Sequence, residues 1–163
     1  MESVIIEKPA LLLVGFDFFG DPFRSHGGWS EENEIGRLWK RWMAFLEHSY
    51  ARIQHIKETE VMYELHVYHD ETPQTGEFEV FVGQELTQLV PLPPEVVVKM
   101  LPPSRYAVFT LVGQEIVADW TWLLDTEWLP ALGVERCTTF SIQRYDARFK
   151  GTQNIEESEL DVY

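Results

Sequence analysis

Cysteine and long apolar runs are scarce in this sequence. The single cysteine, Cys137, excludes an internal disulfide and a zinc site built from four cysteines, and we expect it to be a small buried hydrophobe. The apolar run at 10–16 is too short to cross a bilayer, and Glu2 and Glu7 stand where a signal peptide would carry lysine or arginine. The sequence therefore predicts a cytoplasmic protein that does not contact a membrane.

Positive charge is also scarce. Lysine and arginine number 13 against 27 aspartates and glutamates, which gives a net charge of −14. Binding of nucleic acid or of an anionic membrane needs clustered positive charge, so this domain itself is predicted to bind neither. A cationic small molecule or a basic partner would be attracted by such a field. The alternative is that the acidic residues only keep the protein soluble.

Length and proline spacing predict one domain made of two similar parts. A chain of 163 residues, 45% of them hydrophobic, fits a single packed domain. Five of the nine prolines lie between residues 91 and 103, where they exclude a helix. We therefore expect one domain over 1–163, with a first repeat at about 1–90, a proline-rich connector at 91–103 and a second repeat at about 104–163.

The same order of elements is expected on each side of the connector. In the first repeat, hydrophobic patterning predicts a β-rich run over Val4–Phe19, a helix over Glu31–His48 capped by Ser30, and strands over Val61–His69 and Glu77–Leu86. In the second, it predicts strands over Tyr106–Gly113, Thr138–Arg148 and Glu159–Tyr163, and a helix from about Ile116 that ends near Trp128 because Pro130 follows.

Matching residues support a duplication. Ile35 and Trp39 of the first helix recur as Ile116 and Trp120, and the run at 77–81 recurs at 159–163. The predicted fold class is α+β: a duplicated βαββ repeat that forms an antiparallel sheet or open barrel, with one main helix per half around a pseudo-two-fold cleft. Such a cleft is a natural place for a small molecule.

The whole chain resembles the GyrI-like small-molecule-binding domain, the effector-binding module of multidrug-responsive bacterial regulators. The resemblance is carried by six segments in order: Val14-Gly15, Ile35…Trp39, Gly76…Glu85, Pro103…Phe109, Trp128…Gly133 and Tyr145…Phe149, followed by the closing Leu160…Tyr163. It implies two βαββ repeats with a pocket between them for hydrophobic, often cationic, aromatic compounds.

One position departs from the family pattern. The resemblance implies a glutamate two positions before a tyrosine on the penultimate strand, but here Gln143 precedes Tyr145. An amide offers only a dipole and hydrogen bonds to a ligand, whereas a buried carboxylate attracts a cation. Either the pocket prefers neutral ligands, or another carboxylate such as Asp161 supplies the charge.

The predicted ligand-binding set combines the resemblance with strand alternation and helix stripes. It consists of Trp39, Tyr68, Phe81, Trp120, Gln143, Tyr145, Asp161 and Tyr163. His66 is a further pocket candidate, and Trp29, beside two glycines, lies on a loop that could act as a lid. Trp122 is expected to face outward, because it falls nearly opposite the apolar face of its helix.

The resemblance leaves three functions open: binding of aromatic small molecules as a sensor or sequestering protein, hydrolysis of strained cyclopropane-containing compounds as some members of that family carry out, and antagonism of a protein such as gyrase. For hydrolysis the candidate catalytic residues are Glu79, Glu85 and Tyr145. No cofactor is expected, and the histidine spacing predicts no metal site. A protein partner would need an exposed acidic face.

Overall fold

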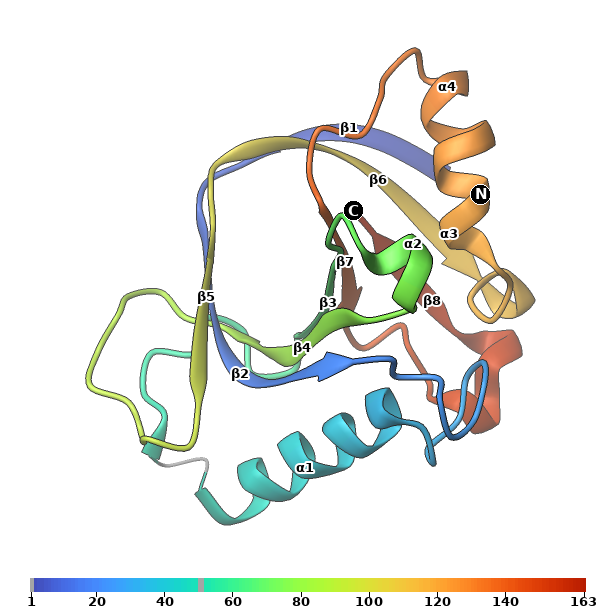
Figure 1. Ribbon diagram of the computed structural model, residues 1–163. Helices are drawn as coiled ribbons and strands as arrows, with labels where there is room; N and C mark the ends of the chain where they lie inside the picture. The colour runs from blue at the N-terminus through green and yellow to red at the C-terminus, as the bar shows by residue number, and fades with distance from the viewer. Residues whose placement is uncertain (1, 50–51) are drawn as a thin grey trace.

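The computed structural model describes residues 2–49 and 52–163, which form one curved eight-stranded sheet with helices on one face (Figure 1). The strands are β1 (Glu2–Lys8), β2 (Leu11–Gly20), β3 (Met62–Val67), β4 (Phe78–Glu85), β5 (Val97–Leu101), β6 (Ser104–Val112), β7 (Phe140–Tyr145) and β8 (Glu159–Val162). The helices are α1 (Glu34–Ser49), α2 (Thr72–Thr75), α3 (Trp120–Leu123) and α4 (Leu129–Ala131), with the 3-10 turns η2 (Gly113–Glu115) and η4 (Thr152–Glu157) and the π-helical turn η3 (Leu124–Trp128).

The strand order is symmetrical about its centre. It runs β1-β6-β8-β7-β3-β4-β2-β5, and every neighbouring pair is antiparallel. Read inward from either end, an edge strand is followed by three strands of one half, β6-β8-β7 from one end and the equivalent β2-β4-β3 from the other, so the two βαββ units meet at the β3–β7 pair. The predicted α+β fold with duplicated units is confirmed, and the sheet does not close into a barrel.

Two strands were not anticipated as separate elements. Pro9 divides the predicted first run, so that β1 leaves its neighbour β2 and pairs with β6 of the other half. The proline-rich connector carries β5, which pairs with β2. Each half therefore receives one edge strand, and the sheet has eight strands where the sequence predicted six.

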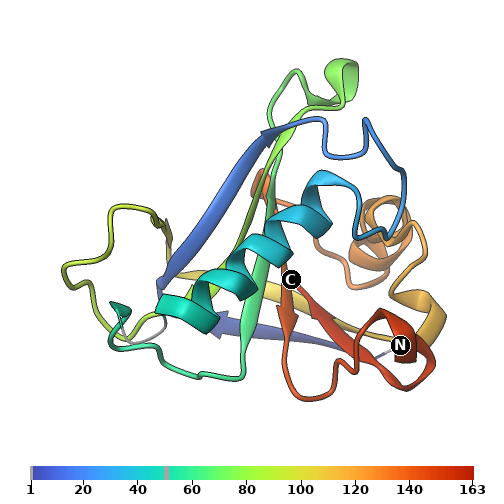
Figure 2. The ribbon, with the colours of Figure 1, turned by 90° about the horizontal axis from the view of Figure 1, so that it is seen from below.

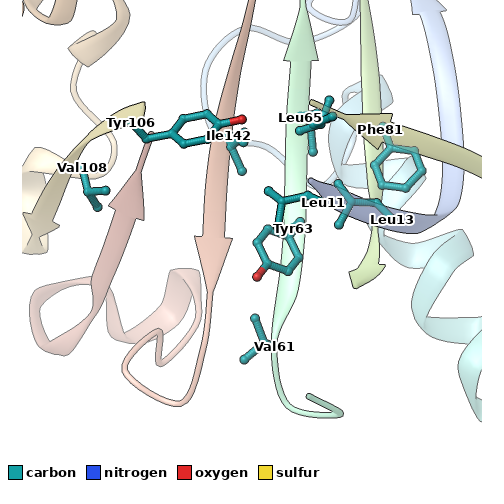
Figure 3. Close-up of a cluster of buried hydrophobic side chains, with 10 residues drawn as sticks. Leu11, Leu13, Val61, Tyr63, Leu65, Phe81, Tyr106, Val108 and Ile142 are labelled. Atoms are coloured by element: carbon teal, nitrogen blue, oxygen red, sulfur yellow. The ribbon is translucent and has the colours of Figure 1, made fainter. Parts of the chain in front are cut away.

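The core is divided between the two faces of the sheet. On one face, α1 lies across β2 and β4, as Figure 2 shows from below. It packs there through Leu38 and Trp42, and the segment at 113–132 packs over β6 and β8. The opposite face buries a separate cluster that includes Leu13, Tyr63 and Ile142 (Figure 3). The candidate site lies on the helix-covered face, at the junction of the two halves.

A close approach of β2 and β4 requires glycine on both strands. Gly15 lies directly across from Gly83 in the register. A Cβ on Gly15 would lie 2.0 Å from the Val82 oxygen, and one on Gly83 would lie 2.1 Å from the Val14 oxygen. The ring of Phe81 occupies the space beside both glycines, which explains why a large ring is fully buried there.

The second helical segment differs from its prediction. It is broken into short turns, and it runs three residues past Trp128 because Pro130 falls in the first turn of α4, where a missing N–H is tolerated. Trp122 is 60% exposed, as expected from its position on the helix. Cys137 is exposed, so its prediction as a buried hydrophobe is wrong. The described residues contain no helix long and apolar enough to cross a membrane.

The first helix begins at Glu34, later than predicted, because Asn33 and not Ser30 caps it. The Gly36 N–H donates to the Asn33 Oδ1 atom at 2.9 Å, and the Asn33 amide donates to the Gly28 carbonyl at 2.8 Å. Ser30 accepts a hydrogen bond only from Glu32, before the helix starts.

We expect Asn33→Ala to lower the free energy of unfolding by about 1–2 kcal/mol, because it removes the cap of a helix that covers half the sheet. Ser30→Ala is the matched control and should change it by less than about 0.5 kcal/mol. Urea denaturation measures both. An equal loss in the two variants would contradict the assignment of Asn33 as the cap.

Candidate ligand-binding site

A buried carboxylate lies at the centre of the helix-covered face. Glu64 on β3 is 4% exposed, and it lies directly across from Gln143 on β7, itself 2% exposed. These two strands are the pair at which the two halves of the molecule meet. The side chains therefore occupy the pseudo-two-fold position at which the sequence predicted a small-molecule site.

Glu64 is held by three side chains. The Trp39 Nε1–H donates to Glu64 Oε2 at 2.5 Å, the Gln143 amide donates to Oε1 at 3.0 Å, and His66 Nε2 lies 2.7 Å from Oε1. The Tyr145 hydroxyl donates in turn to the Gln143 carbonyl at 2.9 Å. We call these five residues the Glu64 cluster. Its hydrogen bonds compensate the desolvation of the carboxylate.

Aromatic rings surround this network. The Tyr145 ring packs edge-on against Trp39 and against Phe149, both at 4.9 Å between centroids, and Trp29 lies 6.3 Å from Phe149. Burial, assisted by the charge of Glu64, raises the pKa of Tyr145 well above its usual value, so its hydroxyl remains a donor at neutral pH. The cluster thus combines a carboxylate with an apolar aromatic enclosure.

The position of Trp39 explains how one helix contributes to a shared site. Trp39 follows the apolar stripe of α1 and packs against the hydrophobic clusters of both halves. Its ring packs edge-on against Tyr145 of the second half, while its N–H donates to Glu64. Trp39, a member of the predicted ligand-binding set, is therefore bonded to the polar centre of the molecule.

A family comparison decides the identity of the chain. The model of the family described as "Cass2: Integron-associated effector binding protein" matches residues 4–163. The chain belongs to the Cass2 effector-binding family. This confirms the resemblance to GyrI-like effector-binding domains, whose fold the solved relatives share.

The proteins similar to this chain include a transcriptional regulator and two solved proteins of similar length. The transcriptional regulator BrlR of Pseudomonas aeruginosa is 29% identical over 164 residues, and the chain spans about half of it, 54%. The integron cassette protein VCH_CASS2 from the mobile metagenome of Vibrio cholerae has a TM-score of 0.61 at 18% identity, with 98% of this chain and 92% of that chain covered. SAV2435, solved with tetraphenylphosphonium, has a TM-score of 0.64 at 15% identity, with 99% and 92% covered.

Part of the predicted ligand-binding set meets in the Glu64 cluster or beside it. Trp39, Gln143 and Tyr145 are members, and Tyr68 lies next to the cluster, 6.4 Å from the His66 ring. Trp120 is buried in the same hydrophobic cluster as Tyr145. Strand alternation brought Gln143 and Tyr145 to one face, as expected. The binding role of each of these residues stays a prediction.

The other three predicted residues lie on the opposite face of the sheet. Phe81 is fully buried in the cluster of Tyr63 and Leu65, against which Tyr163 also packs. Asp161 accepts hydrogen bonds from Arg148 at 2.5 Å and from Thr110 at 2.8 Å, so its charge is already paired. Asp161 is therefore not the carboxylate beside Gln143.

The structure does not bring the candidate catalytic residues together. Glu79 pairs with Lys99, and Glu85 pairs with Lys57 at 3.0 Å and accepts a hydrogen bond from Tyr63 at 3.3 Å. Both glutamates share a face of β4 with Phe81, whereas Tyr145 belongs to the helix-covered face. These three residues form no acid–base arrangement. In the described part of the chain, no cluster of three or more His, Cys, Asp or Glu side chains is placed to hold a metal ion.

Glu64 is the residue that sequence reasoning missed. The available signal was its position two residues before His66, which places both on one face of a strand whose other residues are mostly apolar. What the sequence does not contain is the β3–β7 register, which sets Glu64 opposite Gln143. The carboxylate that the family pattern places at the position of Gln143 is present one strand away.

We expect Gln143→Glu to destabilise the protein most at neutral pH. The new carboxyl group would lie beside Glu64, and two buried carboxylates in contact cannot both ionise, so one pKa in the folded state would rise. A carboxyl group whose pKa is higher in the folded than in the unfolded protein favours folding fully only at pH values below its unfolded pKa of about 4.3. That contribution is lost as the pH increases. The loss of stability should therefore shrink from pH 7 toward pH 4.

Urea denaturation of this variant and of the parent at several pH values measures the effect. Gln84→Glu is the matched control, because Gln84 is fully buried on β4 but its amide donates to the Thr59 carbonyl, away from Glu64. A deficit for Gln143→Glu that does not change between pH 4 and pH 7 would contradict the contact with an ionised Glu64.

Proposed function

We propose that this protein binds hydrophobic aromatic cations at the Glu64 cluster and acts as a sensor or sequestering protein for them. The observation that supports this most directly is a buried carboxylate inside an aromatic enclosure, at the junction of two related halves. An aromatic cation satisfies both parts of such a site, through ion pairing with the carboxylate and through stacking and cation–π contacts with the rings.

The charge of Glu64 is compensated only weakly within the protein. In the described part of the chain, its ion-pair partner within 4.0 Å is His66, and no lysine or arginine reaches it. A carboxylate offers about four acceptor positions, of which the cluster uses three, so one remains for a ligand. A net charge of −14 would further attract cations to the molecule.

Binding requires the aromatic cover to move. Glu64 is only 4% exposed, and the rings of Trp39, Tyr145, Phe149 and Trp29 pack one against the next beside it. The segment between β2 and α1 carries Trp29 beside Gly27 and Gly28, and a Cβ on either glycine would meet no atom within 4 Å. This loop, with the Phe149 ring beneath it, forms the lid in our proposal.

The relatives agree with a role in effector binding. SAV2435 was solved with tetraphenylphosphonium, a lipophilic aromatic cation, and we extend that ligand class to this chain. The chain matches 54% of BrlR, a transcriptional regulator. We propose that this single domain supplies the effector-binding function and that nucleic acid is bound, where a regulator does so, by other segments.

Replacing Glu64 tests the proposal. We expect Glu64→Gln to weaken tetraphenylphosphonium binding at least about tenfold, equivalent to about 1.4 kcal/mol, since the isosteric amide keeps the shape but loses the charge. Binding of triphenylphosphine oxide, a neutral ligand with similar rings, should change less than about twofold. Calorimetric titration of both ligands measures this difference.

The control is Glu60→Gln, an exposed glutamate that precedes β3. It makes the same change in net charge and should leave both affinities unchanged. If Glu60→Gln weakens binding of the cation as much as Glu64→Gln does, the attraction comes from the overall electrostatic field of the protein. If the parent binds neither compound, the binding function itself is wrong.

A second prediction concerns the lid. We expect Trp29→Ala to raise the association and dissociation rate constants for tetraphenylphosphonium several-fold, because Trp29 packs on Phe149, which in turn packs on Tyr145 of the Glu64 cluster. Stopped-flow tryptophan fluorescence measures both rates. Trp122→Ala removes an exposed tryptophan of α3 and should leave the rates unchanged. Unchanged rates in Trp29→Ala would exclude the loop as a lid.

A further inference from the structure

The sheet is open at one place between β6 and β7. Strand β8 joins them, but it pairs with β6 only over 109–112 and with β7 at Gln143 and Arg144, and Tyr163, just after β8, exchanges two backbone hydrogen bonds with Ile142. The first half of β6, at 104–108, therefore has β1 as its strand partner and faces β7 across a gap.

A cavity of about 320 Å³ lies at the gap. Its lining comes from the start of β6, the end of the second helical segment and the residues that lead into β7. Leu124, Leu129, Val134 and Phe140 supply apolar walls. No member of the Glu64 cluster lines it, so the two places are separate.

Two buried polar groups on the cavity lining lack partners. Tyr106 is 6% exposed, and its hydroxyl has no hydrogen-bond partner among the described residues. Figure 3 shows its ring extending from β6 toward Ile142 on β7. The Nη2 atom of Arg136 is likewise buried without a partner in the part of the chain that the structure describes. Unsatisfied groups of this kind are unfavourable unless a ligand or water meets them.

The remaining atoms of Arg136 are fixed. Its Nε donates to Asp125 at 2.9 Å and its Nη1 to the Phe140 carbonyl at 3.4 Å, which holds the guanidinium plane and leaves Nη2 as the free donor. Arg105 also lines the cavity, against one acidic lining residue, Glu135. The lining thus offers hydrogen-bond donors from Arg105, Arg136 and Tyr106, while the charge of Arg136 is paired with Asp125.

We propose that this cavity is a second binding site, which takes a small aromatic carboxylate. The carboxylate would accept hydrogen bonds from Arg136 and Tyr106, and the ring would pack on the leucines and Phe140. A cavity of about 150 Å³ holds benzene, so a volume about twice as large suits two fused rings. Its charge preference is opposite to that of the Glu64 cluster.

Cys137 provides a local reporter of occupancy. It is the single cysteine of the chain, it is exposed, and it lines the cavity. We expect 2-naphthoate to slow alkylation of Cys137 by iodoacetamide at least about fivefold at saturation, while 2-naphthylmethylamine and tetraphenylphosphonium do not. Equal protection by the amine would show an apolar crevice without anion preference. Absence of protection by naphthoate would overturn the proposal.

Two tyrosine variants separate binding from folding. We expect Tyr106→Phe to weaken naphthoate binding about five- to tenfold, because it removes one donor. It should not lower the melting temperature, since the hydroxyl has no partner in the protein. Tyr63→Phe is the matched control: its hydroxyl donates to Glu85 at 3.3 Å, so this variant should lower the melting temperature and keep the naphthoate affinity.

Each variant is measured by calorimetric titration with 2-naphthoate and by thermal denaturation without it. Unchanged naphthoate affinity in Tyr106→Phe would exclude the hydroxyl as a ligand contact and would contradict the proposed site. A lowered melting temperature in Tyr106→Phe without ligand would show that the hydroxyl has a structural role, which also contradicts the proposal.

Discussion

The burial of one carboxylate organises the centre of this protein. Glu64 would be strongly unfavourable on an apolar face without compensation, and Trp39, Gln143 and His66 each direct a polar atom at it. These partners come from α1, from the strand across the junction and from the same strand. The position of the first helix, the register of the central strands and the rotamer of Tyr145 are thus linked through one charged group, and disturbing any of them leaves a buried charge unpaired.

The two halves use this junction unequally. Their strands are arranged symmetrically, but one half supplies a continuous helix of 16 residues and the other a chain of short turns. The polar groups are also divided: the carboxylate and histidine lie on β3, and the amide and tyrosine lie on β7. Duplication therefore provides a common framework, while the chemistry of the site depends on how the halves differ. A pseudo-symmetric fold with an asymmetric centre can orient a ligand in one direction.

Much of the framework was predictable because it depends on local patterning. Alternation placed Gln143 and Tyr145 on one strand face, and hydrophobic patterning predicted the helix that packs on the sheet as α1. The errors arose where a local signal had two solutions. Ser30 and Asn33 are both good capping residues, and only the geometry of the loop before α1 selects Asn33. Pro130 can end a helix or begin one, and here it begins α4.

The sequence by itself determined the α+β class, the duplicated units and the aromatic, acidic character of the chain, because periodicity and composition carry this information directly. Only the tertiary structure decided which carboxylate lies beside Gln143. Glu64 and Gln143 are 79 residues apart, and their contact depends on the antiparallel register of β3 and β7. A shift of one residue would have turned Glu64 away from Gln143. Long-range register follows from the packing of all eight strands, and no local pattern encodes it.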